Sequence, residues 1–373
     1  MSDIDLHYMR VALRLARKGY GRTSPNPMVG AVLVKGGHVI GRGWHHAAGQ
    51  PHAEIEALRD AQNRRHDLRG ATIYVTLEPC STHGRTPPCT EALVAAGVKR
   101  VVIGTTDPNP KHAGRAFKIL KKAKVSVDSL GQPLAEDCTR LNEAFNHWIV
   151  KRTPWVTVKA AMTLDGKIAT TSGESKWITG EAARAEGMRL RLGSDAILVG
   201  VNTILADNPS LTVRGKATKG IRRIVLDSKA RTPLTAKVVK DDQAAATTIV
   251  VGKDAPKKKV AALAKHVNVL VAPSIRSALD LRWLLKRLGA ENVTSLLVEG
   301  GGEVNASFLL GGLAHRVAFF YAPKILGGRD ARRAVAGDGA RSWDDVLELD
   351  DMQWTRLGKD LLLNAKVNRK SKR

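Results

Sequence analysis

The hydrophobic positions of residues 1–150 alternate between helical and strand periodicity. From Asp5 to Lys18 apolar residues recur every three or four positions, which predicts an amphipathic helix. Two apolar runs flank Gly36-Gly37, a pair typical of a β-hairpin turn. Further strands are predicted over 72–77, 100–104 and 125–127, and further helices over 52–61, 90–96 and 115–122. The pattern therefore predicts one sheet covered by helices.

A second unit is expected to begin near residue 150. Residues 136–150 are predicted to form a connecting helix, which Arg152-Thr153-Pro154 ends because proline resists helix continuation. Helices are predicted over 181–192 and 277–288, and strands over 155–161, 196–201, 223–227, 247–252, 267–271, 295–299 and 316–322. This alternation indicates another α/β unit with a largely parallel sheet. We therefore expect domains over 1–150 and 151–373.

Composition restricts the class of protein. The 373 residues are 43% hydrophobic and 25% charged, as in ordinary globular chains. No apolar run approaches the ~20 residues that cross a bilayer, and the first residues do not resemble a secretory signal. Three cysteines do not suffice for a disulfide framework. We therefore expect a cytoplasmic protein without a membrane partner, whose thiols are available to a metal.

The chain is strongly basic, with 60 Lys and Arg against 35 Asp and Glu. Both parts share the excess, with 21 basic and 13 acidic residues in 1–150 and 39 and 22 in the remainder. A positive field attracts phosphorylated metabolites, nucleotide cofactors or nucleic acid, and it does not distinguish among them. The densest runs, at 257–259 and 366–373, are predicted to be solvated.

Three short motifs in the first half predict a zinc site. Pro51-His52-Ala53-Glu54 opens a predicted helix, Glu78-Pro79-Cys80 ends a strand, and Pro87-Pro88-Cys89 precedes the next helix. One imidazole and two thiolates suit tetrahedral zinc with a fourth position open for water, whose pKa the metal lowers. Glu54 is placed to carry the proton, as in the zinc deaminases of nucleobases. A purely structural zinc would need a fourth ligand such as His83, which would leave Glu54 without a function.

With these motifs the chain resembles the bifunctional deaminase-reductases of riboflavin biosynthesis. The specific features are Pro25-Asn26-Pro27-Met28-Val29-Gly30 and the eight residues, rather than two, between Cys80 and Cys89. The resemblance implies a cytidine-deaminase-like three-layer N-terminal domain, a dihydrofolate-reductase-like C-terminal domain and a homo-oligomer, dimer or larger. It implies that His52, Cys80 and Cys89 bind Zn²⁺, that Glu54 is the proton shuttle and that Asn26 holds the pyrimidine. Residues 83–85 would cover the site, with Arg85 near the substrate phosphate.

The second half carries a glycine turn between a predicted strand and helix, at Gly300-Gly301-Gly302. Backbone N–H groups at such a turn can hold a diphosphate. The turn lacks the G-x-G-x-x-G fingerprint, so a conventional Rossmann site is not indicated. Glu303 follows directly, and its carboxylate would repel a diphosphate unless it points away.

The same resemblance extends to the second half and implies an NADPH-dependent reductase. The implied NADPH contacts are Ala161, Trp177, Thr203, Asp207, Ser228, Gly301, Gly302, Glu303, Val304, Asn305, Ala306 and Ser307. The implied substrate contacts are Ser175, Arg191, Leu211, Arg214 and Glu299. Arg191 and Arg214 suit a phosphate because guanidinium groups form forked hydrogen bonds with it. Lys159 and Glu299 are candidates to assist proton transfer, with Lys159 also touching substrate.

The resulting prediction is a two-step enzyme of riboflavin synthesis. Its first half would hydrolyse the amino group of a small phosphoribosylated diaminopyrimidinone, and its second would use NADPH to reduce ribosyl to ribityl. One alternative is a nucleotide or tRNA-editing deaminase, which the long segment between the cysteines and the reductase-like half disfavour. Another is an RNA-binding protein on a deaminase scaffold, which would not need Glu54. We therefore expect no specific nucleic-acid partner.

Overall fold

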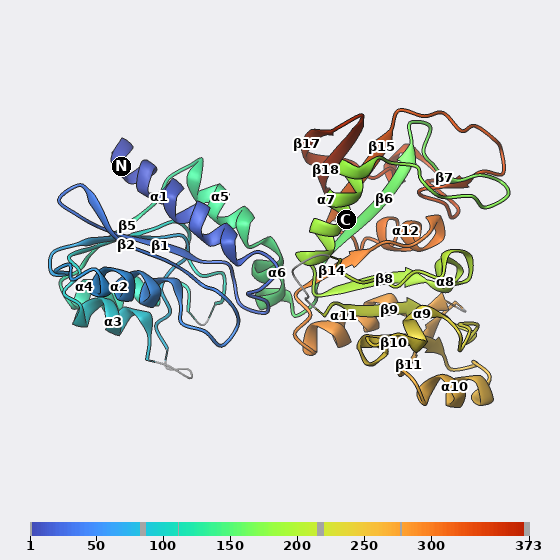
Figure 1. Cartoon of the computed structure of the whole chain (residues 1–373), viewed down its shortest axis with the longest axis horizontal. Coiled ribbons are helices and arrows are strands. Elements are labelled where there is room, and N and C mark those ends of the chain that lie inside the picture. The colour runs from blue at the N-terminus through green and yellow to red at the C-terminus, as the bar shows by residue number, and fades with distance from the viewer. Residues whose placement is uncertain (1, 83–86, 111, 215–219, 277, 369–373) are drawn as a thin grey trace. The chain divides into compact units, whose positions relative to one another are not determined.

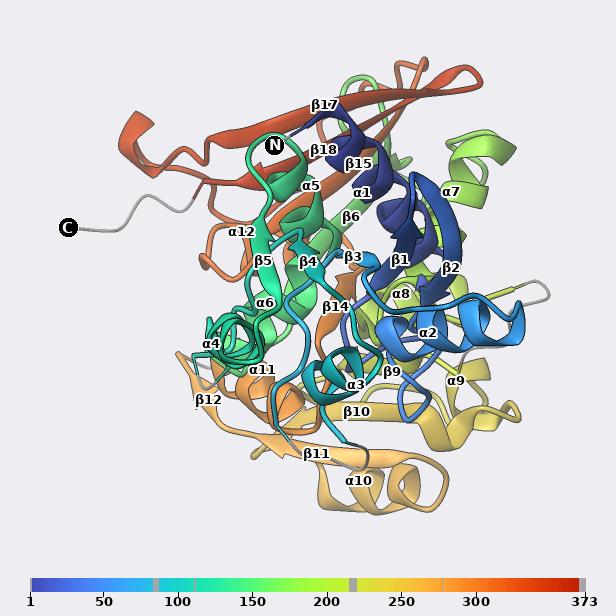
Figure 2. The same ribbon diagram turned by 90° about the vertical axis from the view of Figure 1, so that its left-hand side faces the viewer.

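The computed structural model describes residues 2–82, 87–110, 112–214, 220–276 and 278–368. The chain forms two compact units, Met1–Arg152 and Thr153–Arg373, each with its own sheet (Figures 1 and 2). Within the described residues, no helix combines the length and apolar character that crossing a membrane requires.

The first unit is a sheet between two layers of helices. In chain order its elements are α1 (Asp3–Ala16), η1 (Arg17–Gly19), β1 (Gly30–Lys35), β2 (His38–Trp44), α2 (Ala53–Asn63), β3 (Thr72–Val75), α3 (Cys89–Ala95), β4 (Arg100–Ile103), α4 (Arg115–Lys122), β5 (Ser126–Ser129), α5 (Leu134–Leu141) and α6 (Glu143–Lys151). The strand order is β2-β1-β3-β4-β5. The β2-β1-β3 pairings are antiparallel and the β3-β4-β5 pairings parallel.

Successive side chains of each strand point to opposite faces of the sheet, so the sheet packs against a helical layer on both faces. Ala31 and Leu33 of β1 pack with α2, α3 and α4, whereas Val32 and Val34 pack with α1 and α5. On β2, Gly43 lets α2 approach closely, because a Cβ there would lie 2.1 Å from the carbonyl oxygen of Ala53. This close approach fixes the first turn of α2, next to His52 and Glu54, against the sheet.

The second unit contains a nine-stranded sheet of order β11-β10-β9-β8-β14-β6-β15-β18-β17. Its helices are α7 (Glu181–Leu192), α8 (Val201–Asp207), α9 (Lys237–Lys240), α10 (Lys257–Ala264), α11 (Leu281–Ala290) and α12 (Gly302–Leu309), with 3₁₀ turns η2 (Ala244–Ala246) and η3 (Trp343–Asp345). Its strands are β6 (Trp155–Thr163), β7 (Lys167–Ala169), β8 (Ala196–Gly200), β9 (Arg222–Leu226), β10 (Thr247–Gly252), β11 (Asn268–Ala272), β12 (Ser274–Ile275), β13 (Ala278–Leu279), β14 (Ser295–Val298), β15 (Arg316–Ala322), β16 (Arg332–Arg333), β17 (Leu349–Leu357) and β18 (Asp360–Val367).

The largely parallel sheet predicted for this unit is confirmed. The seven strands from β11 to β15 in the sheet order run parallel, and β18 and β17 add an antiparallel edge. One face packs against α11 and α12 through residues such as Leu284 and Phe308. The opposite face packs against α8 and α9 through residues such as Ile204 and Val238. The mixed α/β class expected for both halves is therefore correct.

Three sequence-based expectations are wrong in detail. The connecting helix expected over 136–150 is two helices, because Asn142 between α5 and α6 leaves helical geometry and exchanges hydrogen bonds with the backbone of Met28. The helix expected from residue 277 begins at Leu281, where the Asp280 side chain caps Trp283 N–H. The prediction omits β17 and β18; β17 is exposed and polar and so lacks a buried apolar run, whereas β18 buries Leu363 and Ala365 and could have been predicted.

A buried ion pair stabilises the first unit and predicts an acid-sensitive contribution to stability. Asp5 of α1 is 3% exposed and accepts hydrogen bonds from Arg100 (2.7 Å) and Tyr74 (2.9 Å). The hydrogen bond from Arg100 holds the pKa of Asp5 well below its usual range, against the effect of burial. A carboxyl whose folded pKa is depressed stabilises the fold above its unfolded pKa, and this contribution is lost as pH falls through the acid range.

Asp5→Asn should therefore lower the free energy of unfolding of this unit by about 2 kcal/mol at pH 7. Urea unfolding at several pH values measures this difference in unfolding free energy between variant and wild type. The difference should become smaller as pH falls below about 4. Asp67→Asn is the matched control, because its pair with Lys35 is exposed and exposed ion pairs contribute little to stability. If the difference in unfolding free energy did not depend on pH, the charge of Asp5 would not be the source of the stabilisation.

Candidate functional site

The first candidate site gathers three ligand atoms from three elements. His52 caps α2, Cys80 follows β3, and Cys89 is the first residue of α3. The His52 Nδ1 atom lies 3.5 Å from Cys80 Sγ and 3.3 Å from Cys89 Sγ, and all ligand atoms lie within 4.8 Å of one another. An imidazole and two thiols at this separation suit zinc, which prefers tetrahedral nitrogen and sulfur ligands.

The electrostatics of the cluster favour a cation. Cys80 accepts a hydrogen bond from the Cys89 backbone N–H (3.1 Å). Hydrogen bonding from Cys89 and from His52 outweighs burial and lowers the pKa of Cys80 well below the usual range of a thiol. A thiolate is therefore present near neutral pH, and thiolates are the form that binds zinc. The donor set fits Zn²⁺ with one coordination position left for a non-protein ligand.

Glu54 lies on the first turn of α2, two residues after His52, and is 3% exposed. Burial, followed by the charge of Cys80, raises the pKa of Glu54 to about 7. A carboxyl group with a pKa near neutrality can both accept and return a proton, which is the property that a general acid-base group requires. Its burial beside the ligand cluster separates it from the bulk solvent.

A cavity of about 210 Å³ opens onto this cluster, and Asn26 lines it. His45, 2% exposed, fixes the side chain of Asn26. The Nδ1 atom of His45 is 3.0 Å from the Pro51 carbonyl oxygen, so this nitrogen carries the hydrogen. Its Nε2 atom then accepts from Asn26 Nδ2 at 3.1 Å. This orientation leaves the Oδ1 atom of Asn26 to accept from a ligand.

Sequence reasoning missed several residues of this cavity, because polar loop residues show no periodicity. Besides His45, the lining includes Asp107, Asn109, His112 and Phe145. Glu78, recognised only as part of a motif, accepts backbone hydrogen bonds from Asp107, Gly114 and Ala116 and so holds the loop before α4 against the site. The residues expected to cover the site, His83, Gly84 and Arg85, lie outside the described part of the chain.

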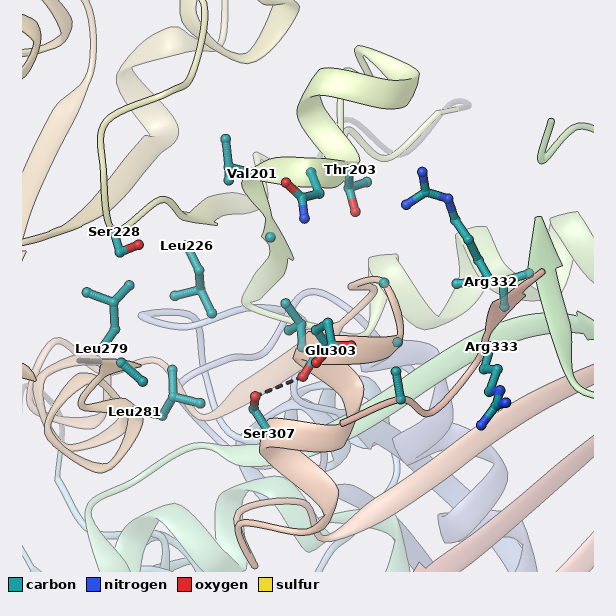
Figure 3. Close-up of a pocket in the computed structure, with 18 of the residues that line it drawn as sticks. Val201, Thr203, Leu226, Ser228, Leu279, Leu281, Glu303, Ser307, Arg332 and Arg333 are labelled. Carbon is teal, nitrogen blue, oxygen red and sulfur yellow. Dashed lines mark hydrogen bonds between the residues drawn. The ribbon is translucent and has the colours of Figure 1, made fainter. Parts of the chain in front are cut away.

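The second unit has a cavity of about 500 Å³ at the carboxyl ends of β8, β9 and β14 (Figure 3). Gly301 and Gly302 open α12 at its centre, and a Cβ at Gly301 would meet no described atom within 4 Å. Backbone N–H groups are therefore approachable at the start of a helix, as a diphosphate requires. Leu226, Leu279 and Leu281 form an apolar end of the cavity beside Ser228.

A neighbouring cavity of about 470 Å³ contains the charged groups expected to touch substrate. Arg191 donates to both carboxylate oxygens of Glu299 at 2.8 Å, and Lys159 Nζ lies 3.8 Å from Glu299 Oε2. Burial would raise the pKa of Glu299, but Lys159 and Arg191 outweigh it and hold that pKa at about 2. The carboxylate is thus charged and fixed between two cations at neutral pH.

The structure divides the residues expected to bind NADPH between the two cavities of the second unit. The larger cavity is lined by Thr203, Ser228, Gly301, Gly302, Glu303, Val304 and Ser307. The neighbouring cavity is lined by Ala161, Trp177 and Asp207, together with the expected substrate residues Lys159, Arg191, Leu211, Arg214 and Glu299.

Three expected residues line neither of these cavities. Ser175 does not line the neighbouring cavity itself but donates at 3.1 Å to Asp207, which does. Asn305 and Ala306 are buried on the far side of α12, where Asn305 donates to the Ala334 carbonyl oxygen. Direct contact of Asn305 and Ala306 side chains with a cofactor does not follow from this arrangement.

Two family models match the chain, one in each unit. Residues 2–105 match the cytidine and deoxycytidylate deaminase zinc-binding region. Residues 154–363, more than half of the chain, match the RibD C-terminal domain. The first match covers His52, Cys80 and Cys89, and the second covers both cavities of the second unit.

Curated relatives match almost the whole chain. The riboflavin biosynthesis protein RibD of Actinobacillus pleuropneumoniae is 45% identical over 97% of this chain and 95% of its own length. The protein of the same name from Escherichia coli strain K12 is 38% identical over 96% of this chain and 98% of its own length.

Solved structures agree with these relatives. RibD from Acinetobacter baumannii superposes with a TM-score of 0.85 at 36% identity, covering 98% of this chain and 99% of the other. A diaminohydroxyphosphoribosylaminopyrimidine deaminase/5-amino-6-(5-phosphoribosylamino)uracil reductase from Thermotoga maritima gives a TM-score of 0.83 at 34% identity, with coverage of 98% and 99%.

Proposed function

Because the chain belongs to the RibD family, the bifunctional deaminases and reductases of riboflavin biosynthesis, we propose which residues carry each of its two reactions. Residues 1–150 are proposed as the zinc-dependent deaminase domain and 151–373 as the NADPH-dependent reductase domain. The observation that carries the proposal is the His52, Cys80 and Cys89 cluster beside the buried carboxyl of Glu54.

In the deaminase, His52, Cys80 and Cys89 would hold Zn²⁺, which supplies an activated water when bound. Glu54 accepts the proton of that water and returns it to the departing ammonia, so the amino group of the diaminopyrimidinone is replaced by oxygen. Asn26, held by His45, accepts a hydrogen bond from the pyrimidine through Oδ1. Asn26 therefore orients the ring, and it does not take part in proton transfer.

In the reductase, NADPH would supply the hydride that converts the open, imine-like form of the ribosylamine to ribityl. Helix α8 connects the two cavities, because Val201 and Thr203 line the larger one and Asp207 the neighbouring one. Ser228 and the apolar end of the larger cavity would hold the adenosine half, and Ala161 and Trp177 would hold the nicotinamide half. Arg191, Arg214 and Glu299 bind the substrate, and Lys159 is the candidate proton donor.

The remaining expectations are part of the same proposal. The protein would act in the cytoplasm on a small phosphoribosyl pyrimidine and would form a homo-oligomer, a dimer or larger. Nucleic acid is not proposed as a partner, since the cavities of both units have the residues of small-molecule sites.

A coupled assay on the full chain tests whether the two reactions occur separately and in the proposed order. With the phosphoribosylated diaminopyrimidinone as substrate, ammonia release and NADPH oxidation are followed separately. We expect ammonia without NADPH present, and NADPH oxidation only once the deaminated intermediate has formed or been added. NADPH oxidation with the undeaminated substrate, at the same rate and without ammonia release, would contradict the proposed order.

A further inference from the structure

Arg332 lies on a short segment that is fixed directly to the glycine turn of the larger cavity. Residues Arg332 and Arg333 form β16, which pairs with β7. The Ala336 N–H donates to the Gly302 carbonyl oxygen (3.1 Å), and a Cβ on Gly302 would lie 2.4 Å from the carbonyl oxygen of Arg333. The backbone of this segment thus touches the start of α12.

Two further hydrogen bonds hold the segment in place. Asn305, fully buried, donates from Nδ2 to the Ala334 carbonyl oxygen at 2.8 Å, and Ala334 N–H donates to the Gly166 carbonyl oxygen at 3.0 Å. This explains why Asn305 matters without lining the cavity. The position of Arg332 is therefore set by the same helix whose first residues are proposed to bind the cofactor.

The side chain of Arg332 extends toward the side of the cavity that Thr203 lines. Figure 3 shows it extending from β16 to the level of Thr203, whereas Arg333 extends the other way. Arg332 is exposed, and among the described residues it forms no ion pair. Its guanidinium group therefore has hydrogen-bond donors available to a ligand.

The charged residues that line the cavity carry both signs. Of the described residues that line it, the charged ones are Glu303 and three arginines, Arg231, Arg332 and Arg333. Glu303 is next to the glycine turn and disfavours an anion there. Arg231 donates to Asn202 Oδ1 at 3.0 Å, and Arg333 points away from Thr203. Arg332 is thus the arginine placed to offset Glu303.

We propose that Arg332 binds the diphosphate of the dinucleotide cofactor, an inference that rests on the proposed reductase function. The apolar leucines and Ser228 occupy the opposite end of the cavity, and Glu303, which directly follows the glycine turn, lies between them and Arg332 (Figure 3). A cofactor with its adenine among the leucines places its diphosphate at the turn. Any phosphate on its adenosine ribose stays at the Ser228 end, away from Arg332.

Arg332→Ala tests this inference by binding, measured by titration calorimetry on the full chain. The probes are NADPH, NADH, which has the diphosphate but no 2′-phosphate, and adenosine 2′-monophosphate, which has no diphosphate. We expect affinity to fall about tenfold for both dinucleotides, because charge-assisted hydrogen bonds are lost, and to stay unchanged for the monophosphate. The KM for NADPH should rise with kcat unchanged at saturation.

Arg329→Ala is the matched control, since Arg329 is exposed on the same segment but does not line the cavity. It should leave all three affinities within about twofold of wild type. An Arg332→Ala protein that binds both dinucleotides like the control, or that loses affinity for NADPH alone, overturns the inference. If wild type binds neither dinucleotide, the proposed reductase function fails as well.

Discussion

Glu54→Gln should reduce ammonia release by about 10³-fold or more, because the variant can no longer take the proton of water or return it to the leaving amine. Metal binding should persist, since Glu54 is not among the three residues that gather as ligands. The measurement combines the kcat for ammonia release with zinc content per chain. Reduction of the deaminated intermediate, added directly, should proceed at the wild-type rate.

Glu56→Gln is the matched control for this prediction. Glu56 lies on the same turn of α2, but it contacts His46 and Arg59 and does not line the cavity. This variant should release ammonia within about twofold of wild type, because surface ion pairs contribute little. Normal ammonia release by Glu54→Gln would remove the proposed role of the carboxyl group.

Glu299→Gln should lower kcat/KM for NADPH oxidation by about 100-fold, measured with the deaminated intermediate supplied. The substitution removes the carboxylate that fixes Arg191 and neutralises Lys159 in the substrate cavity. Truncating one partner of a buried charge pair leaves the other charges uncompensated and costs about 2–5 kcal/mol. Ammonia release should be unchanged, because the deaminase residues lie in the other unit.

Glu291→Gln provides the comparison within the same unit. Glu291 also pairs with two arginines, Arg222 and Arg287, but it lines neither cavity. Loss of NADPH oxidation in both variants would point to a general loss of stability, so thermal unfolding is followed in parallel. Loss in Glu299→Gln alone, in a protein that is still folded at the assay temperature, is the expected result.

The fold was predictable wherever burial imposes a period on the sequence. The buried strands of both sheets coincide with apolar runs, and in β1 the alternating residues separate onto two helical layers. Prediction failed where tertiary contacts determine the conformation of the backbone. Asn142 ends α5 because its side chain binds Met28, 114 residues away, and β17 exists by pairing with β18 and not by burying a face.

In the candidate sites, too, residues set by local spacing could be predicted and residues set by tertiary contacts could not. His52, Glu54, Cys80 and Cys89 could be proposed from the sequence because metal chemistry restricts both residue type and local spacing. His45 and Arg332 could not be identified, because their positions depend on contacts made by the folded chain. His45 reaches Asn26 across 19 residues, and Arg332 reaches the glycine turn through contacts near Gly302 and Asn305.

Zinc removal followed by metal restoration tests the central claim most directly. The full chain is treated with a chelator, and zinc content, ammonia release and NADPH oxidation with added intermediate are measured before and after zinc is returned. Our account predicts one zinc per chain, loss of ammonia release with the metal, its recovery on restoration, and undiminished NADPH oxidation throughout. Ammonia release that continues at the original rate in zinc-free protein would contradict the account.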